Sequence, residues 1–241
     1  MPRPTSDPAV DRKRDKAIMH RIPEPELMDE AEQARAYALA DFAEPNERFV
    51  GYFETTFPEL RAGNVLDLGC GPGDIVVRLA SRHPGLVVHG LDGSAAMLQF
   101  ACELLHESPA LGGRVQFIEG VLPGATLPLA GYDAVISNSL LHHLHDAAIF
   151  WRALQEAGRP GAAVLVMDLF RPVSVTAATA LVAQYAANEP EVLQRDFLAS
   201  LCAAFEPAEV RQQLAAHGLD SLLVTEVSDR HLLVSGYLPG R

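Results

Sequence analysis

Apolar and polar positions alternate along this chain with two different periods, and the regions where each period holds predict its elements. Between residues 64 and 169, short apolar runs of strand length alternate with segments whose apolar positions recur at helical spacing. We expect strands at Val65–Leu68, Val87–Asp92, Val115–Glu119, Tyr132–Ser137 and Ala163–Leu169. Strands that alternate with helices in this way predict a parallel sheet with helices on both faces.

Helical spacing continues on both sides of this region. Before it, residues 28–57 predict two helices with a break near Glu44-Pro45-Asn46. After it, we expect three helices and then two strands, at Val173–Ala187, Val192–Phe205, Val210–His217, Leu222–Val227 and Leu232–Leu238. Because the two final strands follow each other directly, they predict a reversed hairpin at the edge of the sheet.

A glycine-rich turn follows the first predicted strand and limits which ligands the sheet can bind. Asp67 lies at the end of the apolar run, and Gly69, Gly71 and Gly73 follow at alternate positions. Glycine has no Cβ, so the backbone can approach a ligand closely, and the helix start behind the turn favours negatively charged groups. A turn that binds a nicotinamide dinucleotide has the spacing G-x-G-x-x-G, but Asp74 stands where its third glycine belongs.

A second acidic residue supports a ligand that contains a ribose. Asp92 ends the next predicted strand, about 20 residues after the glycines, where a ribose-binding carboxylate is expected. Tyr132–Ser137 and Arg159-Pro160-Gly161 follow in order before the last parallel strand. This ordered set, from Asn64 to Pro172, resembles the class I S-adenosylmethionine-dependent methyltransferases of the type that acts on small molecules.

The resemblance implies a fold, a cofactor and the residues that bind it. The fold would be a Rossmann-like, doubly wound α/β sheet of seven mostly parallel strands with an antiparallel edge strand, and the cofactor would be S-adenosyl-L-methionine. Asp67 would lie near the amino group of the cofactor, the glycines would line its amino-acid portion, and Asp92 would accept both ribose hydroxyls. At the adenine, Val121 replaces the aspartate of many relatives, so main-chain groups of Val121 and Leu122 would take its place. The expected cofactor contacts are Asp67, Gly69, Cys70, Gly71, Gly73, Asp92, Gly93, Val121, Leu122 and Asn138.

We therefore expect one folded core with added helical segments. In chain order these are a flexible tail at 1–20, a helical cap at 21–60, the cofactor-binding core at 61–172, a helical lid at 173–206, and a helix with closing strands at 207–241. Sheets of this kind bind ligands outside the carboxyl ends of their strands, so the cap and the lid would flank that crevice.

The stretch after the fourth predicted strand holds the candidate catalytic histidines. His142, His143 and His145 precede Asp146, a combination that resembles a set of metal ligands. On a helix, however, His142 and His145 would share a face and His143 would point elsewhere, so we expect no metal site. Packing against the cofactor, a structural role and general-base catalysis by His142 or His143 stay open.

Four residues elsewhere complete the candidate site. Asp168, at the end of the fifth strand, is a further candidate base, and Arg171 beside it would clamp a substrate carboxylate; a local Asp168–Arg171 ion pair is the alternative. Tyr37 in the N-terminal helices and Arg195 in the lid are candidate substrate contacts. For Tyr37 a position in the core is equally open.

The charge, the lysine positions and the cysteines of the chain exclude several classes of protein. The net charge is −12 with no basic stripe, which argues against a nucleic-acid partner. The only lysines, Lys13 and Lys16, lie in the predicted tail, which excludes a Schiff-base lysine and a P-loop in the folded part. No apolar run is long enough to cross a bilayer, and the three cysteines form no disulfide or metal-ligand pattern, which favours the cytoplasm.

We predict a cytoplasmic S-adenosylmethionine-dependent methyltransferase that acts on a small-molecule acceptor. One alternative is an enzyme similar to carboxy-S-adenosylmethionine synthase, which would need Arg171 or Arg195 to bind a carboxylated substrate. Another is a non-catalytic cofactor-binding scaffold, which a homodimer through the N-terminal helices would favour. A nicotinamide-dependent oxidoreductase is disfavoured by Asp74.

Replacing Asp92 with alanine tests the ribose assignment. The variant should bind S-adenosylmethionine more weakly by about 1–3 kcal/mol, because the ribose loses a charged hydrogen-bond acceptor. Calorimetric titration measures this difference. Unchanged affinity in a folded Asp92→Ala variant would show that Asp92 does not bind the ribose.

Overall fold

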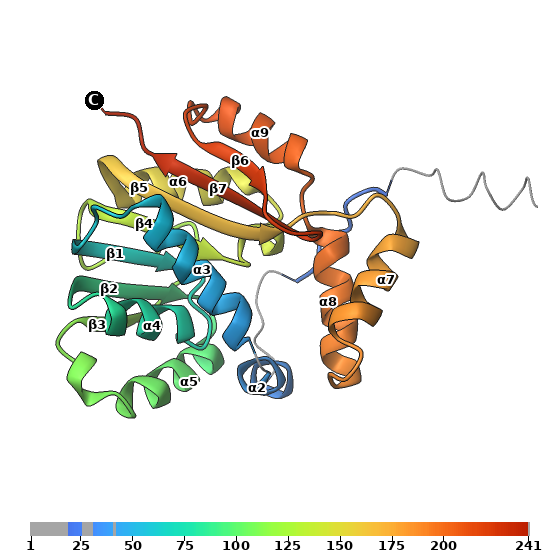
Figure 1. Ribbon diagram of the computed structural model, residues 1–241, viewed down its shortest axis with the longest axis horizontal. Helices are drawn as coiled ribbons and strands as arrows, with labels where there is room; N and C mark the ends of the chain where they lie inside the picture. The colour runs from blue at the N-terminus through green and yellow to red at the C-terminus, as the bar shows by residue number, and fades with distance from the viewer. Residues whose placement is uncertain (1–18, 26–30, 41, 241) are drawn as a thin grey trace, which may run out of the picture.

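The computed structural model describes residues 19–25, 31–40 and 42–240. Its centre is a seven-stranded sheet in the order β3-β2-β1-β4-β5-β7-β6 (Figure 1). The strands are β1 (Ala62–Leu68), β2 (Gly85–Asp92), β3 (Val115–Glu119), β4 (Tyr132–Asn138), β5 (Gly158–Leu169), β6 (Leu223–Glu226) and β7 (His231–Tyr237). Strands β1 to β5 pair in parallel, whereas β7 runs antiparallel to both of its neighbours, β5 and β6.

This topology confirms the predicted Rossmann-like, mostly parallel sheet and locates its reversed strand. The two final strands do pair as a hairpin, but the reversed strand β7 is inserted between β5 and β6 rather than lying at the outer edge. Strand β5 also begins earlier than predicted, at Gly158, which pairs with Tyr132 of β4 before the register between the two strands shifts.

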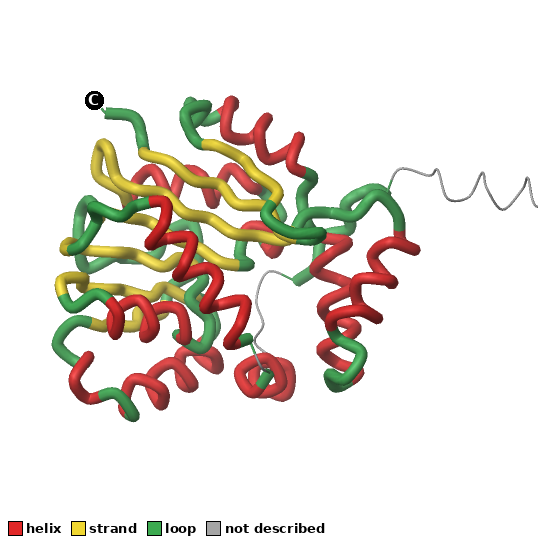
Figure 2. The backbone as a smooth tube through the Cα atoms, viewed as in Figure 1, coloured by secondary structure: helices red, strands yellow, loops and turns green. Residues whose placement is uncertain are grey.

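Helices cover both faces of the sheet, and three more lie beyond the carboxyl ends of the strands (Figures 1 and 2). One face carries α3 (Ala43–Thr56), α4 (Asp74–Arg82) and α5 (Ala95–His106); the other carries α6 (Ala147–Ala157) and α9 (Pro207–Ala216). The remaining helices are α2 (Ala31–Leu39), α7 (Val175–Tyr185) and α8 (Glu191–Ala203). None of the helices in the described part of the chain is long and apolar enough to cross a membrane.

Alternate residues of each central strand belong to two different hydrophobic clusters. On β1, Val65 packs with Phe53 of α3, whereas its neighbour Leu66 packs in the cluster that holds Trp151 of α6, and all four side chains are buried. Side chains of a strand point to alternate faces, and here both faces are covered by helices. The near-continuous apolar runs of the sequence follow from this two-sided burial.

The N-terminal region differs in detail from the prediction. Helix α2 ends at Leu39 and α3 begins at Ala43, so Pro45 lies in the first turn of α3, where a missing N–H removes no hydrogen bond. The predicted break near Glu44-Pro45-Asn46 is therefore a helix start. Residues 1–18 of the predicted tail lie outside the described residues, and Met19, which we also placed in the tail, is buried.

Arg171 connects the N-terminal segment to the end of β5 and to the start of α9. Its guanidinium donates to the carbonyls of Met19 at 2.9 Å and Ala204 at 2.8 Å, and it pairs with Glu206 and Glu209 at 3.1 Å each. The side chain is only 5% exposed. A long side chain that can satisfy four acceptors at once is directed into this junction rather than toward solvent or a ligand.

This position corrects both expectations for Arg171. It does not open onto a substrate site, and it forms no ion pair with Asp168, which instead bonds His142. Arg171 is a structural bridge.

Replacing Arg171 with methionine should lower the free energy of unfolding by about 3 kcal/mol, because two buried carbonyls and two carboxylates lose a charged donor. Chemical denaturation measures this change. Arg195→Met is the matched control: that side chain is 72% exposed, so its free energy of unfolding should change by less than about 0.5 kcal/mol. Equal stabilities of the two variants would contradict the bridging role.

Candidate functional site

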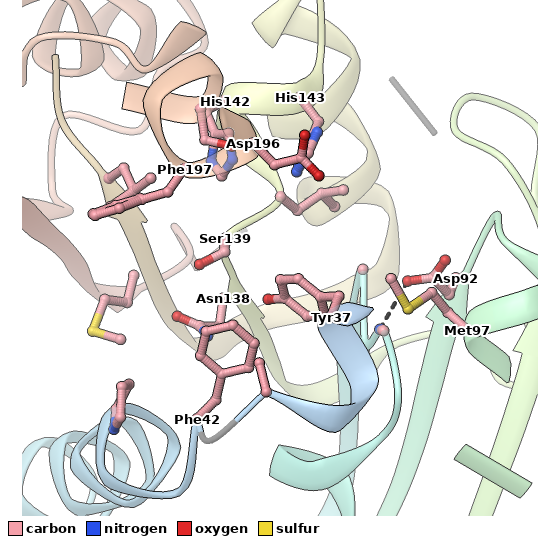
Figure 3. A pocket seen from close by; sticks show the side chains of 18 of the residues that line it. Tyr37, Phe42, Asp92, Met97, Asn138, Ser139, His142, His143, Asp196 and Phe197 are labelled. Carbon is pink, nitrogen blue, oxygen red and sulfur yellow. Dashed lines mark hydrogen bonds between the residues drawn. The ribbon is translucent and has the colours of Figure 1, made fainter. Parts of the chain in front are cut away.

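A pocket of about 450 Å³ lies at the carboxyl ends of the strands. Its floor comes from the turns after β1, β2 and β4, and its walls come from the α2–α3 connection and the α7–α8 pair. Figure 3 shows His142, His143 and Asp196 close together and apart from Asp92. The pocket therefore has two ends of different chemistry.

The glycine turn and Asp92 form one end. Gly69 and Gly71 both line the pocket in the left-handed backbone region, with φ of 71° and 52°, where a side chain would strain the backbone. The N–H of Gly71 donates to Oδ2 of Asp92, and the N–H of Ser94 donates to Oδ1, each at 2.8 Å. These bonds fix the orientation of the carboxylate at the pocket wall, where Gly93 also lies.

Two residues of the turn serve packing instead of lining the pocket. A Cβ on Gly73, whose φ is 83°, would lie 2.6 Å from the ring of Phe117, so this glycine lets α4 approach β3. The side chain of Cys70 is buried against Gly90, and burial raises the pKa of its thiol. Neither Cys70 nor Gly73 lines the pocket, so the structure does not support their predicted contacts with the cofactor.

Asp67 lies beneath the turn, outside the lining of the pocket. Its Oδ1 is buried without a hydrogen-bond partner, and burial, followed by the charge of Asp92, raises the pKa of Asp67 well above its ordinary value. Asn138, which does line the pocket, likewise has a buried Oδ1 without a partner. Buried acceptors without a donor are uncommon, so these two oxygens are available for donors of a ligand or of water.

An apolar surface adjoins Asp92. Val121 and Leu122 line the pocket together with Leu91 and Met97, and Val121 is 51% exposed. A flat aromatic group would bury this surface, and the side chains of Val121 and Leu122 offer it no hydrogen-bonding group.

His142 and His143 form the other end, in a geometry that the sequence did not predict. Leu141–His143 is a short 3₁₀ turn, and the two imidazole rings lie side by side with their centroids 4.3 Å apart. The Nδ1–H of His142 donates to Oδ1 of Asp168 at 2.5 Å, and its Nε2 lies 3.5 Å from Oε1 of Glu24. The same Glu24 oxygen lies 3.4 Å from Nδ1 of His143.

This arrangement corrects our expectation that His143 points away from His142. His145, expected on the face of His142, instead meets the backbone carbonyl of Glu24 at 2.8 Å on the exposed side. The chain leaves the 3₁₀ turn after His143, so helical spacing does not hold through this stretch.

Glu24 is the site residue that sequence reasoning missed. Arg21 anchors its segment, because the guanidinium donates to the carbonyls of His142 at 2.9 Å and Leu144 at 2.8 Å. The Oγ of Ser200 in α8 donates to Glu24 at 3.0 Å. No periodicity or motif connects residue 24 with residue 142, so only tertiary structure places them together.

The polar end is buried, and its groups change one another's protonation. Burial opposes a charge on His142, but Asp168 and Glu24 outweigh it and raise the pKa of His142. Burial and the neighbouring His142 lower the pKa of His143 to about 3, so His143 is neutral. Burial raises the pKa of Glu24.

The remaining candidates divide between pocket and surface. Tyr37 lines the pocket with its ring 4.7 Å from that of Phe42, and burial, with the charges of Asp92 and Asp168, raises the pKa of Tyr37 to about 12. Asp168 does not line the pocket and acts on it through His142. Arg195 is exposed and pairs with Asp196, so the structure does not support it as a substrate contact.

Comparisons with known proteins identify the domain. A family model described as a methyltransferase domain matches residues 65–161. An uncharacterised methyltransferase of Mycobacterium tuberculosis is 34% identical over 108 residues, which are 45% of this chain and 51% of that protein. The matched region, residues 65–161, is similar to methyltransferase domains, and its motifs are those of the class I S-adenosylmethionine-dependent type.

Two further matches fit this methyltransferase domain. The trans-aconitate 2-methyltransferase of Deinococcus radiodurans is 34% identical over 114 residues, which are 47% of this chain and 40% of that protein. The chain thus spans about half the length, or less, of these curated relatives. A solved O-methyltransferase family protein from Burkholderia thailandensis has the same fold, with a TM-score of 0.65 at 20% identity over 88% of this chain and 61% of that one.

A solved human N-acetylserotonin methyltransferase, 16% identical to this chain, holds S-adenosylmethionine, and the described residues of this chain fit that cofactor. The carboxylate of Asp92 would receive the ribose hydroxyls, and the apolar surface at Val121 would receive the adenine. The unpartnered oxygens of Asp67 and Asn138 would accept hydrogen bonds from the amino-acid portion, directly or through water.

His231, a further residue that lines the pocket, generates a prediction about pH. Burial, followed by the charge of Arg230, lowers the pKa of His231 to about 4. Below about pH 6.5 the unfolded chain therefore binds a proton at His231 that the folded chain excludes. The free energy of unfolding then decreases by up to about 1.4 kcal/mol for each unit by which the pH is lowered.

His231→Gln should remove that part of the slope between about pH 6.5 and 4. Urea denaturation of both proteins at several pH values in this window measures the difference. Parallel stability curves for the variant and the wild type would contradict the burial of a neutral His231.

Proposed function

We propose that the protein transfers the methyl group of S-adenosylmethionine to a small-molecule acceptor bound between the Leu141–His143 turn and the α7–α8 pair. The supporting observation is that one pocket holds the Asp92 end and the histidine end. Methyl transfer is an in-line displacement, so an enzyme must hold the cofactor and the acceptor on opposite sides of the moving carbon and exclude water.

The histidine end is suited to an acceptor that loses a proton. S-adenosylmethionine, when bound, supplies an electrophilic methyl carbon, and a hydroxyl or thiol attacks it efficiently only after deprotonation. Because Asp168 accepts the Nδ1–H of His142, the opposite nitrogen of that ring presents its lone pair toward Glu24. We infer an acceptor with a hydroxyl or thiol group.

The charges along the walls disfavour a carboxylated acceptor such as the trans-aconitate of the named relatives. The lining includes the acidic residues Glu44, Glu189 and Asp196 in addition to Asp92. Of the arginines whose placement is described, Arg230 lines the pocket, but its guanidinium lies over the Tyr185 ring at 3.3 Å and pairs with Asp229 at 3.1 Å. An enzyme similar to carboxy-S-adenosylmethionine synthase would need Arg171 or Arg195 to bind a carboxylated substrate. Neither arginine lines the pocket, so this alternative is disfavoured.

Labelled transfer tests the function. The protein should bind S-adenosylmethionine and S-adenosylhomocysteine but no nicotinamide dinucleotide, and it should move the labelled methyl group to hydroxylated or thiol acceptors in preference to carboxylic acids. Cofactor binding without transfer to any acceptor class would favour the scaffold alternative.

A cytoplasmic location, a homodimer and the absence of a nucleic-acid partner stay predictions from the sequence.

Asp168→Asn tests the orientation of His142. The variant should lower kcat by about 100-fold or more, because the ring loses the acceptor that fixes its orientation, while its affinity for S-adenosylmethionine should stay unchanged. Asp133→Asn is the matched control, since Asp133 pairs with Arg159 outside the pocket and should leave kcat unaltered. Equal kcat values for the two variants would contradict the positioning role of Asp168.

A further inference from the structure

We propose that Glu24, His142 and His143 form a binding site for a divalent transition-metal cation at the acceptor end of the pocket. Among the described residues, they are the group of three metal-ligating side chains whose ligand atoms converge, all within 4.8 Å of one another. His142 and His143 line the pocket, so such a cation would face the space where an acceptor enters.

Two of the three distances between the ligand atoms are close to those of a tetrahedral coordination sphere, and all three are within 4.8 Å. Oε1 of Glu24 lies 3.5 Å from Nε2 of His142 and 3.4 Å from Nδ1 of His143. Metal–ligand bonds of about 2.0–2.1 Å in a tetrahedral zinc site place neighbouring ligand atoms about 3.3 Å apart. Both measured edges need to change by only a few tenths of an ångström.

The three ligand atoms lie close together, and none of them carries a hydrogen when Asp168 takes the proton-bearing side of His142 and Glu24 is ionised. The carboxylate of Asp168 takes the Nδ1–H of His142, which leaves the lone pair on Nε2, and Nδ1 of His143 is buried without a hydrogen-bond partner. Burying acceptors face to face costs free energy unless something positive lies between them. A proton on His142 would satisfy one of these contacts, whereas a divalent cation would satisfy all three.

The surrounding residues already support the ligands. Histidines that bind a metal almost always donate their other ring N–H to a carboxylate or carbonyl, and Asp168 accepts from His142 in this way. Ser200 donates to Glu24, and Arg21 holds the backbone of the His142 turn. The three ligand side chains are at most 11% exposed.

The ligand types select the class of cation. Two imidazole nitrogens and one carboxylate oxygen suit zinc and other first-row transition metals, whereas magnesium prefers a shell of oxygens. Three protein ligands leave a coordination position open, as in catalytic sites.

The role of the cation rests on the proposed function. An acceptor oxygen in the open position would have its pKa lowered and release its proton to water. It would then form the bond to the methyl carbon while the electron pair of the broken C–S bond stays on sulfur.

Zinc titration tests the site without any acceptor. Full-length protein stripped with a chelator should bind one equivalent of zinc by calorimetry, and no magnesium. Cobalt in its place should give the visible absorption of a tetrahedral site. Glu24→Gln, which keeps the shape of the side chain, and His143→Ala should each abolish stoichiometric binding, and Asp168→Asn should weaken it by about 10–100-fold. Glu54→Gln is the matched control, because Glu54 pairs with a single histidine, His83, at 3.1 Å and should bind zinc like the wild type.

The outcomes separate the two proposals. No zinc binding by the wild type, or equal binding by Glu24→Gln, overturns the metal site, and Glu24→Gln decides alone if His143→Ala does not fold. S-adenosylmethionine binding and methyl transfer that persist in the zinc-free protein would leave the proposed function intact and overturn the role of the metal. Zinc binding in a protein that binds no S-adenosylmethionine would support the metal site and contradict the proposed function.

Discussion

The hydrogen bond between Asp168 and His142 connects the end of β5 to the turn after β4, and the acceptor half of the pocket depends on it. It fixes which nitrogen of His142 carries the proton and directs the other toward Glu24. Glu24 in turn accepts a hydrogen bond from Ser200 of α8. The α7–α8 pair, which forms a wall of the pocket, is thereby connected to His142 through Glu24. A buried carboxylate thereby orients a histidine at the end of the pocket where we propose that the acceptor binds.

The two ends of the pocket are built by different means. The cofactor end is local: the glycine turn and Asp92 lie at the ends of adjacent parallel strands, and backbone N–H groups hold the carboxylate in place. The acceptor end is assembled from segments that are far apart in the chain, with Arg21 binding the His142 turn and Arg171 binding Met19. Local construction suits a function shared across a fold, whereas long-range construction allows the acceptor end to vary.

This difference explains what the sequence could predict. Asp92 and the pocket glycines followed from strand ends and spacing, because parallel strands bring such positions to one edge. Helical spacing failed at His143, since three residues in a 3₁₀ turn do not follow the period of an α-helix. Glu24 and Arg171 were beyond sequence reasoning, because their partners lie in distant segments that only tertiary packing brings together.

A crystal structure of the protein with S-adenosylhomocysteine would test whether the two ends of the pocket bind the cofactor and the acceptor as proposed. We expect the ribose hydroxyls to bind Asp92, the adenine to lie against Val121 and Leu122, and the sulfur to face His142 and His143 across the pocket. A ligand whose sulfur faces away from the two histidines, or whose ribose lies off Asp92, would contradict the assignment of the two ends.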